Sequence, residues 1–257
     1  MNTMTDVSTL DSLSHDEAMA LQATELDRTV ALLRTLDASD WSTQTDCPDW
    51  DVSQMYLHVL GACEAGASMR ENLHQLRAAK KHQKFYGGPL EAALSAVQVR
   101  ERAHLTADEL VDRFAEVAPR TVRGRSRTPR LMRRAKMKVD GPVIETWALG
   151  YLIDTIYLRD LWMHRVDAAR ATGREMELTP EHDGRIVADV VAEWYRRHGQ
   201  AFTLTLAGPA GGSFGALGTA DEPSIEPVQL ELDAVEFCRI LAGREPGDGL
   251  LSTVVPF

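Results

Sequence analysis

The sequence predicts a mostly helical protein in two parts, a bundle of long helices followed by a small α+β unit. Three observations support this fold class. Apolar residues recur with helical spacing over most of residues 14–173, and capping residues stand where the helices should begin. Alternation with a period of two residues, which is typical of strands, appears only in the C-terminal part. The length of 257 residues is also more than one compact core usually needs.

Four long helices are predicted in the N-terminal part. Ser14 with Glu17 and Asp51 with Gln54 form capping boxes at the start of the first two helices. Residues 1–13, which precede the first cap, are polar and are expected to form a disordered tail. The four expected helices cover residues 14–37, 51–81, 90–118 and 143–171.

The last two of these helices are delimited by glycine and proline. A Gly-Gly-Pro sequence at 87–89 breaks the chain before the third helix. Within that helix, Thr106 with Glu109 offers a second start, which predicts a bend. A Gly-Pro pair at 141–142 opens the fourth helix, and Gly173 stops it.

The C-terminal part, residues 174–257, has the pattern of a small α+β domain. A helix is expected from Thr179, with Pro180 at its first position, to about His198. Two strands with alternating apolar residues flank a glycine-rich turn, and one more helix follows. The ranges are Phe202–Leu206 and Val228–Leu232 for the strands and Ala234–Leu241 for the helix.

Composition excludes several classes of protein. Hydrophobic residues make up 44% and charged residues 26% of the chain, which is typical of a globular protein. No apolar stretch approaches the roughly 18 residues of a membrane span, and the N-terminus has no secretion-signal pattern. We therefore expect a cytoplasmic protein with no membrane partner. Because the 3 cysteines are odd in number and widely spaced, a metal site would need histidine and carboxylate ligands.

The net charge of −10 argues against nucleic-acid binding, because phosphate contacts need a basic surface. Residues 120–138 are the exception, since they contain nine Lys or Arg and no acidic residue. Two interpretations of this segment stay open. It is either a solvated basic loop or helix end, or a rim that attracts an anionic ligand to a neighbouring site.

Two ionisable residues lie on the apolar stripe of the fourth predicted helix. Asp160 and His164 are four residues apart, so their side chains leave one face of the helix a single turn apart, toward the expected core. A lone buried carboxylate costs several kcal/mol unless it is protonated, ion-paired or bound to a cation. His58 lies on the second helix beside small residues and could face this pair.

His58, Asp160 and His164 could supply two nitrogen ligands and one oxygen ligand to a metal that keeps an open coordination position, as catalytic zinc sites do. Asp167, three residues after His164, could accept a hydrogen bond from an imidazole N–H behind the ligands. From spacing alone, the alternative is a buried histidine that is hydrogen-bonded to an aspartate and binds no metal.

Three stretches of the sequence carry a family resemblance. They are LDASDWSTQTDCPDWDVSQMYLHVLGACE (36–64), YLRDLWMHRVDAARATGR (157–174) and DAVEFCRILAGRE (233–245). Together they resemble the actinobacterial maleylpyruvate isomerase family, the mycothiol-dependent branch of the DinB superfamily. This resemblance implies a DinB-like four-helix bundle over residues 14–173 and a domain related to sterol-carrier folds over residues 174–257.

The resemblance also implies functional residues. The metal triad of the family corresponds to His58, Asp160 and His164. The family pattern has Glu where this chain has Asp160, and the shorter side chain could alter metal geometry or substrate choice. The catalytic arginine of the family is matched best by Arg244 and less well by Arg239.

The resemblance implies a metal-dependent enzyme, with zinc as the expected ion, that activates mycothiol as a thiolate. Addition of this thiol to a small electrophile, with a carboxylate held by Arg244, would give isomerisation or S-transfer. Two alternatives remain open: a metal-dependent hydrolase that activates water, and a stress or ligand-binding protein that holds a metal without turnover. We expect a monomer or a small homo-oligomer whose partners are the thiol and the substrate.

Overall fold

The computed structural model describes residues 4–140, 144–216 and 226–257, and the chain divides into two compact units. The helical unit comprises Ser14–Met176, and the α+β unit comprises Met1–Leu13 together with Glu177–Phe257. The predicted fold class, a helical N-terminal part with a small α+β C-terminal part, is confirmed. Among the described residues, no helix has both the length and the apolar character needed to cross a membrane.

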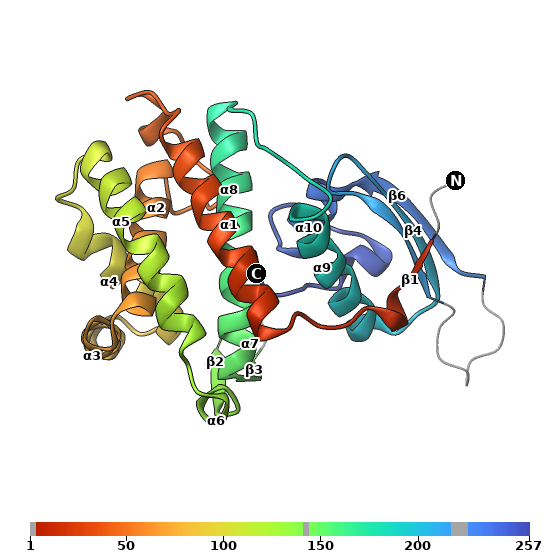
Figure 1. The fold of residues 1–257 in the computed structure, drawn as a ribbon, viewed down its shortest axis with the longest axis horizontal. Coiled ribbons are helices and arrows are strands. Elements are labelled where there is room, and N and C mark those ends of the chain that lie inside the picture. Colours follow the sequence, from red (N-terminus) through yellow and green to blue (C-terminus); the bar gives the residue numbers. More distant parts are fainter. Residues whose placement is uncertain (1–3, 141–143, 217–225) are drawn as a thin grey trace. The chain divides into compact units, whose positions relative to one another are not determined.

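The helical unit is built around a bundle of α1, α2, α5 and α8 (Figure 1). In this bundle α5 packs against α1 and α2, α8 also packs against α1 and α2, and the hairpin of α3 and α4 lies against α2. Leu26, Val59, Phe114 and Leu161, one from each bundle helix, are buried in a shared apolar core. The helices are α1 (His15–Leu33), α2 (Val52–Ala67), α3 (Met69–Tyr86), α4 (Leu90–Arg102), α5 (Ala107–Ser126), α6 (Arg130–Arg133), α7 (Leu149–Tyr151) and α8 (Tyr157–Thr172).

Side-chain caps start the main helices where the sequence predicts them. Ser14 with Glu17 and Asp51 with Gln54 form complete capping boxes at α1 and α2. The expected second start at Thr106 is a full break, because its capping box begins the separate helix α5. Each cap satisfies backbone N–H groups that have no partner within the helix and so fixes where the helix begins.

The predicted helix over residues 51–81 is interrupted at Ser68. Its backbone is extended, with φ −143° and ψ 116°, and its hydroxyl accepts a hydrogen bond from the Glu71 N–H at the start of α3. Ser68 thus ends α2 and caps α3. This break lets α3 turn away from the bundle and form a hairpin with α4 (Figure 1).

The prediction of one continuous helix from residue 143 is wrong. Strands β2 (Lys136–Asp140) and β3 (Ile144–Ala148) pair as an antiparallel hairpin, in which Met137 opposes Trp147. Branched and aromatic residues in β3 favour this pairing over helix. The predicted helix start at residues 141–142 lies outside the described residues. Helical structure begins at Leu149 and passes through a π-helical turn, Leu152–Ile156, before α8.

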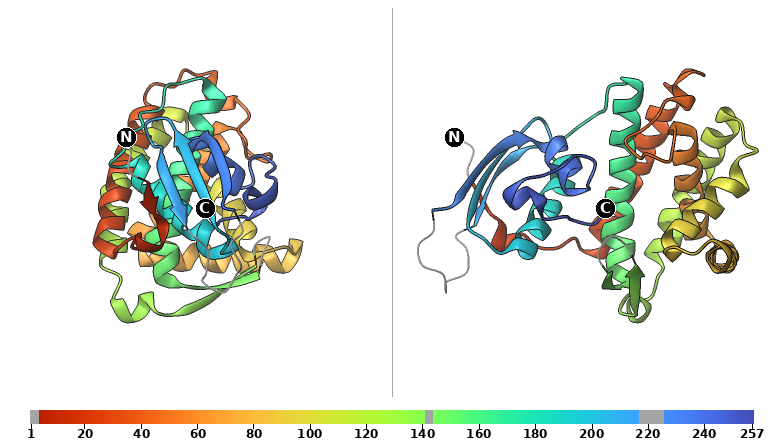
Figure 2. Two further views of the ribbon diagram at one scale, coloured as in Figure 1. Left: turned by 90° about the vertical axis from the view of Figure 1, so that its right-hand side faces the viewer. Right: turned by 180° about the vertical axis from the view of Figure 1, so that it is seen from behind.

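In the α+β unit, α9 (Asp183–His198) and α10 (Ala234–Leu241) pack on one face of a four-stranded sheet (Figure 2). The strand order is β1-β5-β4-β6, with β4 antiparallel to β5 and parallel to β6. The strands are β1 (Thr5–Asp6), β4 (Phe202–Ala207), β5 (Gly212–Ala216) and β6 (Val228–Asp233). The expected glycine-rich turn therefore contains a strand of its own.

The expectation of a disordered tail over residues 1–13 is not met by its described part. Thr5 and Asp6 pair in parallel with Phe214 and Gly215 at the sheet edge, and Val7 is buried. A two-residue strand has no periodicity that could reveal it. The pairing partners lie more than two hundred positions away in the sequence, so local patterns do not report this contact.

Candidate metal centre

The bundle brings together the three residues singled out as possible ligands. His58 comes from α2, and Asp160 and His164 come from successive turns of α8. One donor atom from each of the three lies within 4.8 Å of the other two. The imidazole centroids are 5.8 Å apart with the rings nearly perpendicular, and Nε2 of His164 lies 3.3 Å from Oδ1 of Asp160. Two nitrogens and one oxygen thus converge from two helices.

His58 is held in place by contacts on two sides. Its ring stacks on Trp50, with centroids 4.9 Å apart, and its Nδ1 lies 2.8 Å from Oε1 of Gln98. Burial lowers the pKa of His58 to about 4, although the nearby Asp160 carboxylate opposes the shift. At neutral pH this imidazole is therefore uncharged and keeps one nitrogen lone pair, as a metal ligand must.

His164 is in the opposite electrostatic state. Burial would lower its pKa, but the charge of Asp160 and contacts with Asp160, Asp167 and Cys47 raise the pKa well above its usual value. Without a cation, His164 carries a proton that neutralises Asp160. A metal ion at this position would replace that proton, since a ligating imidazole must be neutral.

Asp167 lies behind His164, as predicted for a residue that orients a ligand. It is fully buried, and its Oδ2 is 3.4 Å from Nδ1 of His164. The thiol of Cys47 is 3.6 Å from the same Asp167 oxygen. The sequence pattern does not indicate Cys47 as part of this site, because it lies in the connection between α1 and α2 and belongs to no ligand motif. Nδ1 of His164 faces this pair, which leaves Nε2 on the Asp160 side.

The two arginines predicted from the resemblance belong to the α+β unit. Arg239, on α10, is almost fully buried and forms ion pairs with Glu236 at 2.5 Å and Glu245 at 3.2 Å. Arg244 follows the end of α10 and is partly exposed, and its backbone N–H donates to the carbonyl of Arg239. These ion pairs hold Arg239 against the turn after α10, and the substrate-binding roles of Arg239 and Arg244 stay predictions.

The basic segment 120–138 is split between buried and exposed positions. Arg125 is buried, donates to Oε1 of Gln22 at 2.8 Å and lies 4.1 Å above the ring of Tyr157. Arg133 pairs with Asp154 at 3.3 Å. Arg125 ties α5 to α1 and α8, and Arg133 ties α6 to the π-helical turn before α8, so part of the segment has a structural role.

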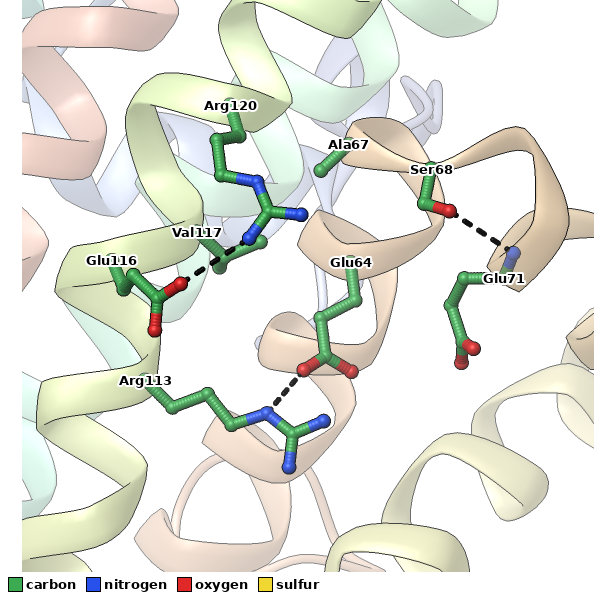
Figure 3. A pocket seen from close by; sticks show the side chains of 8 residues that line it. All are labelled: Glu64, Ala67, Ser68, Glu71, Arg113, Glu116, Val117 and Arg120. Atoms are coloured by element: carbon green, nitrogen blue, oxygen red, sulfur yellow. Dashed lines mark hydrogen bonds and ion pairs between the residues drawn. The ribbon is translucent and has the colours of Figure 1, made fainter.

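A pocket of about 250 Å³ opens elsewhere on the helical unit, between α2, α3 and α5 (Figure 3). Glu64 pairs there with Arg113, and Glu116 pairs with Arg120 at 3.3 Å. None of the three candidate ligands lines this pocket. Its charges are neutralised by one another, so we place the chemistry at the histidine site instead.

The fold and this site define a class of protein: a helical bundle with two histidines and a carboxylate that could hold a metal ion, followed along the chain by a small α+β domain. The mycothiol maleylpyruvate isomerase N-terminal domain model matches residues 22–169, which is more than half of the chain. The chain belongs to this family, and the suspected resemblance is confirmed. It is an enzyme of the maleylpyruvate isomerase type.

Solved structures share the fold over nearly the whole chain. The mycothiol-dependent maleylpyruvate isomerase matches with a TM-score of 0.58 and 16% identity, over 93% of this chain and 94% of that chain. A histidine-to-alanine mutant of that enzyme matches with a TM-score of 0.57 and 15% identity, over 92% and 93% of the respective chains. No protein with a curated description matches in sequence.

Proposed function

We propose that this protein is a metal-dependent enzyme that uses mycothiol as cosubstrate, with His58, Asp160 and His164 as the ligands of a divalent cation, expected to be zinc. The observation that carries the proposal is the convergence of these three side chains from α2 and α8. Membership in the mycothiol maleylpyruvate isomerase family supplies the thiol.

The donor set fits such an ion. Two imidazoles and one carboxylate are ligands of catalytic zinc sites, and tetrahedral bonds of about 2.1 Å place ligand atoms roughly 3.4 Å apart. The 3.3 Å between His164 and Asp160 already matches this separation. Three protein ligands leave a position open for a thiol. A divalent cation bound there would lower the pKa of that thiol, so that it reacts as a thiolate at neutral pH.

The chain's own residues prepare this chemistry. Burial keeps His58 neutral, Asp160 contributes the negative charge that attracts a cation, and Asp167 orients His164 from behind. We assign to Arg244 the role of binding the substrate carboxylate, because a guanidinium can hold a carboxylate through two parallel hydrogen bonds.

The reaction class is reversible addition of a thiol to an electrophilic double bond. The sulfur bonds to one carbon of a cis enoate, and the proton goes to the neighbouring carbon. The new single bond rotates, and elimination breaks the C–S bond to release the trans product and the thiol. In S-transfer the C–S bond remains. The same residues serve both outcomes, and maleylpyruvate is the first substrate to test.

The experiment measures conversion of maleylpyruvate by the zinc-loaded protein, with mycothiol, with other thiols and with no thiol. We expect the trans isomer, or a stable thioether, only when mycothiol is present, and no turnover with water alone. Turnover at the same rate without any thiol would contradict the proposal, and a cleaved product that has taken up water would identify a hydrolase. Saturable uptake of substrate without product under every condition would identify a binding protein.

A further inference from the structure

Two buried glutamines connect His58 to the outer helices α3 and α4. Gln98 on α4 and Gln75 on α3 are 2% and 1% exposed, which is unusual for residues that carry a polar amide. Nε2 of Gln98 donates to Oε1 of Gln75 at 2.9 Å, and Oε1 of Gln98 lies 2.8 Å from Nδ1 of His58. Buried amides are costly unless their donors and acceptors are all paired. The hydrogen bonds from Gln75 through Gln98 to His58 must therefore all donate in one consistent direction.

The partners of Gln75, the outermost residue of this hydrogen-bond series, fix the direction of donation. Nε2 of Gln75 donates to the carbonyl of Gly61 at 2.9 Å and to Oε1 of Glu71 at 2.9 Å. The carbonyl can only accept. Partial burial opposes ionisation of Glu71, but hydrogen bonds from Gln75 and Arg102 keep its pKa below the usual value, so it also only accepts.

With both donors of Gln75 directed outward, its oxygen must accept from the Gln98 amide, and the oxygen of Gln98 must accept from His58. Nδ1 of His58 therefore carries the hydrogen. The lone pair is on Nε2, the nitrogen that is not used by Gln98.

We propose that Gln98, oriented by Gln75, is a positioning residue that locks His58 in the Nδ1–H tautomer and so presents Nε2 to the cation. The metal-binding part of this inference rests on the proposed function, whereas the tautomer is a property of the protein alone. Metal-bound histidines commonly have their other nitrogen fixed in this way, usually by a carboxylate or a carbonyl.

Gly61 on α2 makes room for this contact. A Cβ at this position would lie 2.6 Å from Cγ and 2.7 Å from Cβ of Gln98, distances that force the glutamine to move. Arg102 holds the same turn of α4, because its Nη1 donates to the Gln98 carbonyl at 3.1 Å. Arg102 is itself paired with Glu64 and Glu71, two residues that line the pocket of Figure 3.

The test compares the full-length wild type with Gln98→Leu, which has no acceptor, and Gln98→Glu, which keeps an oxygen facing Nδ1. The first measurement is nitrogen NMR of the His58 ring in the metal-free protein at neutral pH. We expect hydrogen on Nδ1 in the wild type and in Gln98→Glu, and loss of this single tautomer in Gln98→Leu. Hydrogen on Nε2 in the wild type overturns the proposal.

The second measurement is zinc affinity by competition with a chelator. We expect binding to weaken about 10- to 100-fold in Gln98→Leu and to be largely restored in Gln98→Glu. Gly61→Ala, which displaces Gln98 without changing it, should weaken zinc binding similarly. Gln83→Leu, which removes a partly exposed glutamine on α3 whose amide donates to the Gly88 carbonyl, is the matched control and should bind as the wild type does.

The outcomes separate the two proposals. Equal zinc affinity in the wild type and Gln98→Leu refutes the positioning role but leaves the metal site standing. A wild type that shows the Nδ1–H tautomer but binds no zinc refutes the proposed function and leaves the tautomer assignment intact. If Gln98→Leu does not fold, the wild-type NMR result and the Gly61→Ala variant still decide the matter.

Discussion

His164 and Arg165 are neighbours on α8, and both are buried, yet they belong to two different kinds of polar cluster. Arg165 faces Glu25 of α1 and donates to both carboxylate oxygens, at 2.5 and 2.9 Å. His164 faces Asp160 at 3.3 Å, with His58 opposite. The arginine pair joins a guanidinium and a carboxylate through two hydrogen bonds, whereas the histidine cluster brings together two imidazoles and a carboxylate, which are groups that bind metal ions.

On one helix, the two clusters therefore differ in their capacity to bind a metal ion. In this bidentate pair the guanidinium has no lone pair to offer a metal, and both oxygens of the Glu25 carboxylate accept hydrogen bonds from it. In the metal-free protein, the raised pKa of His164 means that this imidazole holds a proton beside Asp160. We infer that the arginine pair locks α8 against α1 and that the histidine cluster is where a ligand enters.

Breaking the arginine pair should give the largest effect on stability. Arg165→Met removes the guanidinium that pairs with the fully buried carboxylate of Glu25, and we expect the free energy of unfolding to fall by about 3–5 kcal/mol. Urea denaturation measures this change. Arg123→Met removes an exposed arginine from α5 and should change stability by less than about 0.5 kcal/mol.

The zinc content of Arg165→Met tests whether the arginine pair and the histidine cluster act independently. Folded Arg165→Met should still bind zinc with the wild-type stoichiometry, because Arg165 is not a ligand. Loss of zinc from a folded Arg165→Met protein would mean that the two clusters are not separate in function.

A smaller effect is expected in a third quantity, the number of protons that the protein releases when zinc binds. Because the pKa of His164 is raised well above its usual value, this residue is protonated at pH 7 in the metal-free protein, and a ligand must give up that proton. Zinc binding at pH 7 should therefore release about one proton from His164 and essentially none from His58, whose pKa is near 4. Calorimetry in buffers of different ionisation enthalpy measures this number.

The raised pKa of His164 also determines how zinc affinity and stability change with pH. As pH falls, the proton on His164 competes better and zinc affinity should decrease. The stabilising effect of the protonated His164 on the metal-free fold is complete below an unfolded pKa of about 6.5, and it is lost as pH rises through the higher folded pKa. Zinc binding with no proton release at pH 7 would contradict the assigned state of His164.

Much of the helical unit could be predicted from the sequence, because local chemistry determines it. The capping residues Ser14, Asp51 and Thr106 act within one turn of chain, and each begins a helix as expected. The four-residue spacing of Asp160 and His164 places them on one face wherever α8 forms. Ser68, with Glu71 three residues later, was an equally local signal that our helix prediction passed over.

Other features depend on contacts that local patterns do not contain. Residues 144–148 are strand because they pair with Lys136–Asp140, and the π-helical turn before α8 rotates earlier residues relative to Asp160. Gln98 gave no sequence signal as a partner of His58. Its position follows from the packing of α4 on α2 at Gly61, which only the folded structure brings together.

The most direct test of the account is elemental analysis of the purified protein beside two variants. The wild type should carry about one divalent ion per chain. His164→Ala, which removes a proposed ligand, should carry none, whereas His74→Ala, which removes a half-exposed histidine paired with Glu101 on the outer hairpin, should keep the ion. A full equivalent of metal retained in folded His164→Ala would contradict the claim that His58, Asp160 and His164 share one cation.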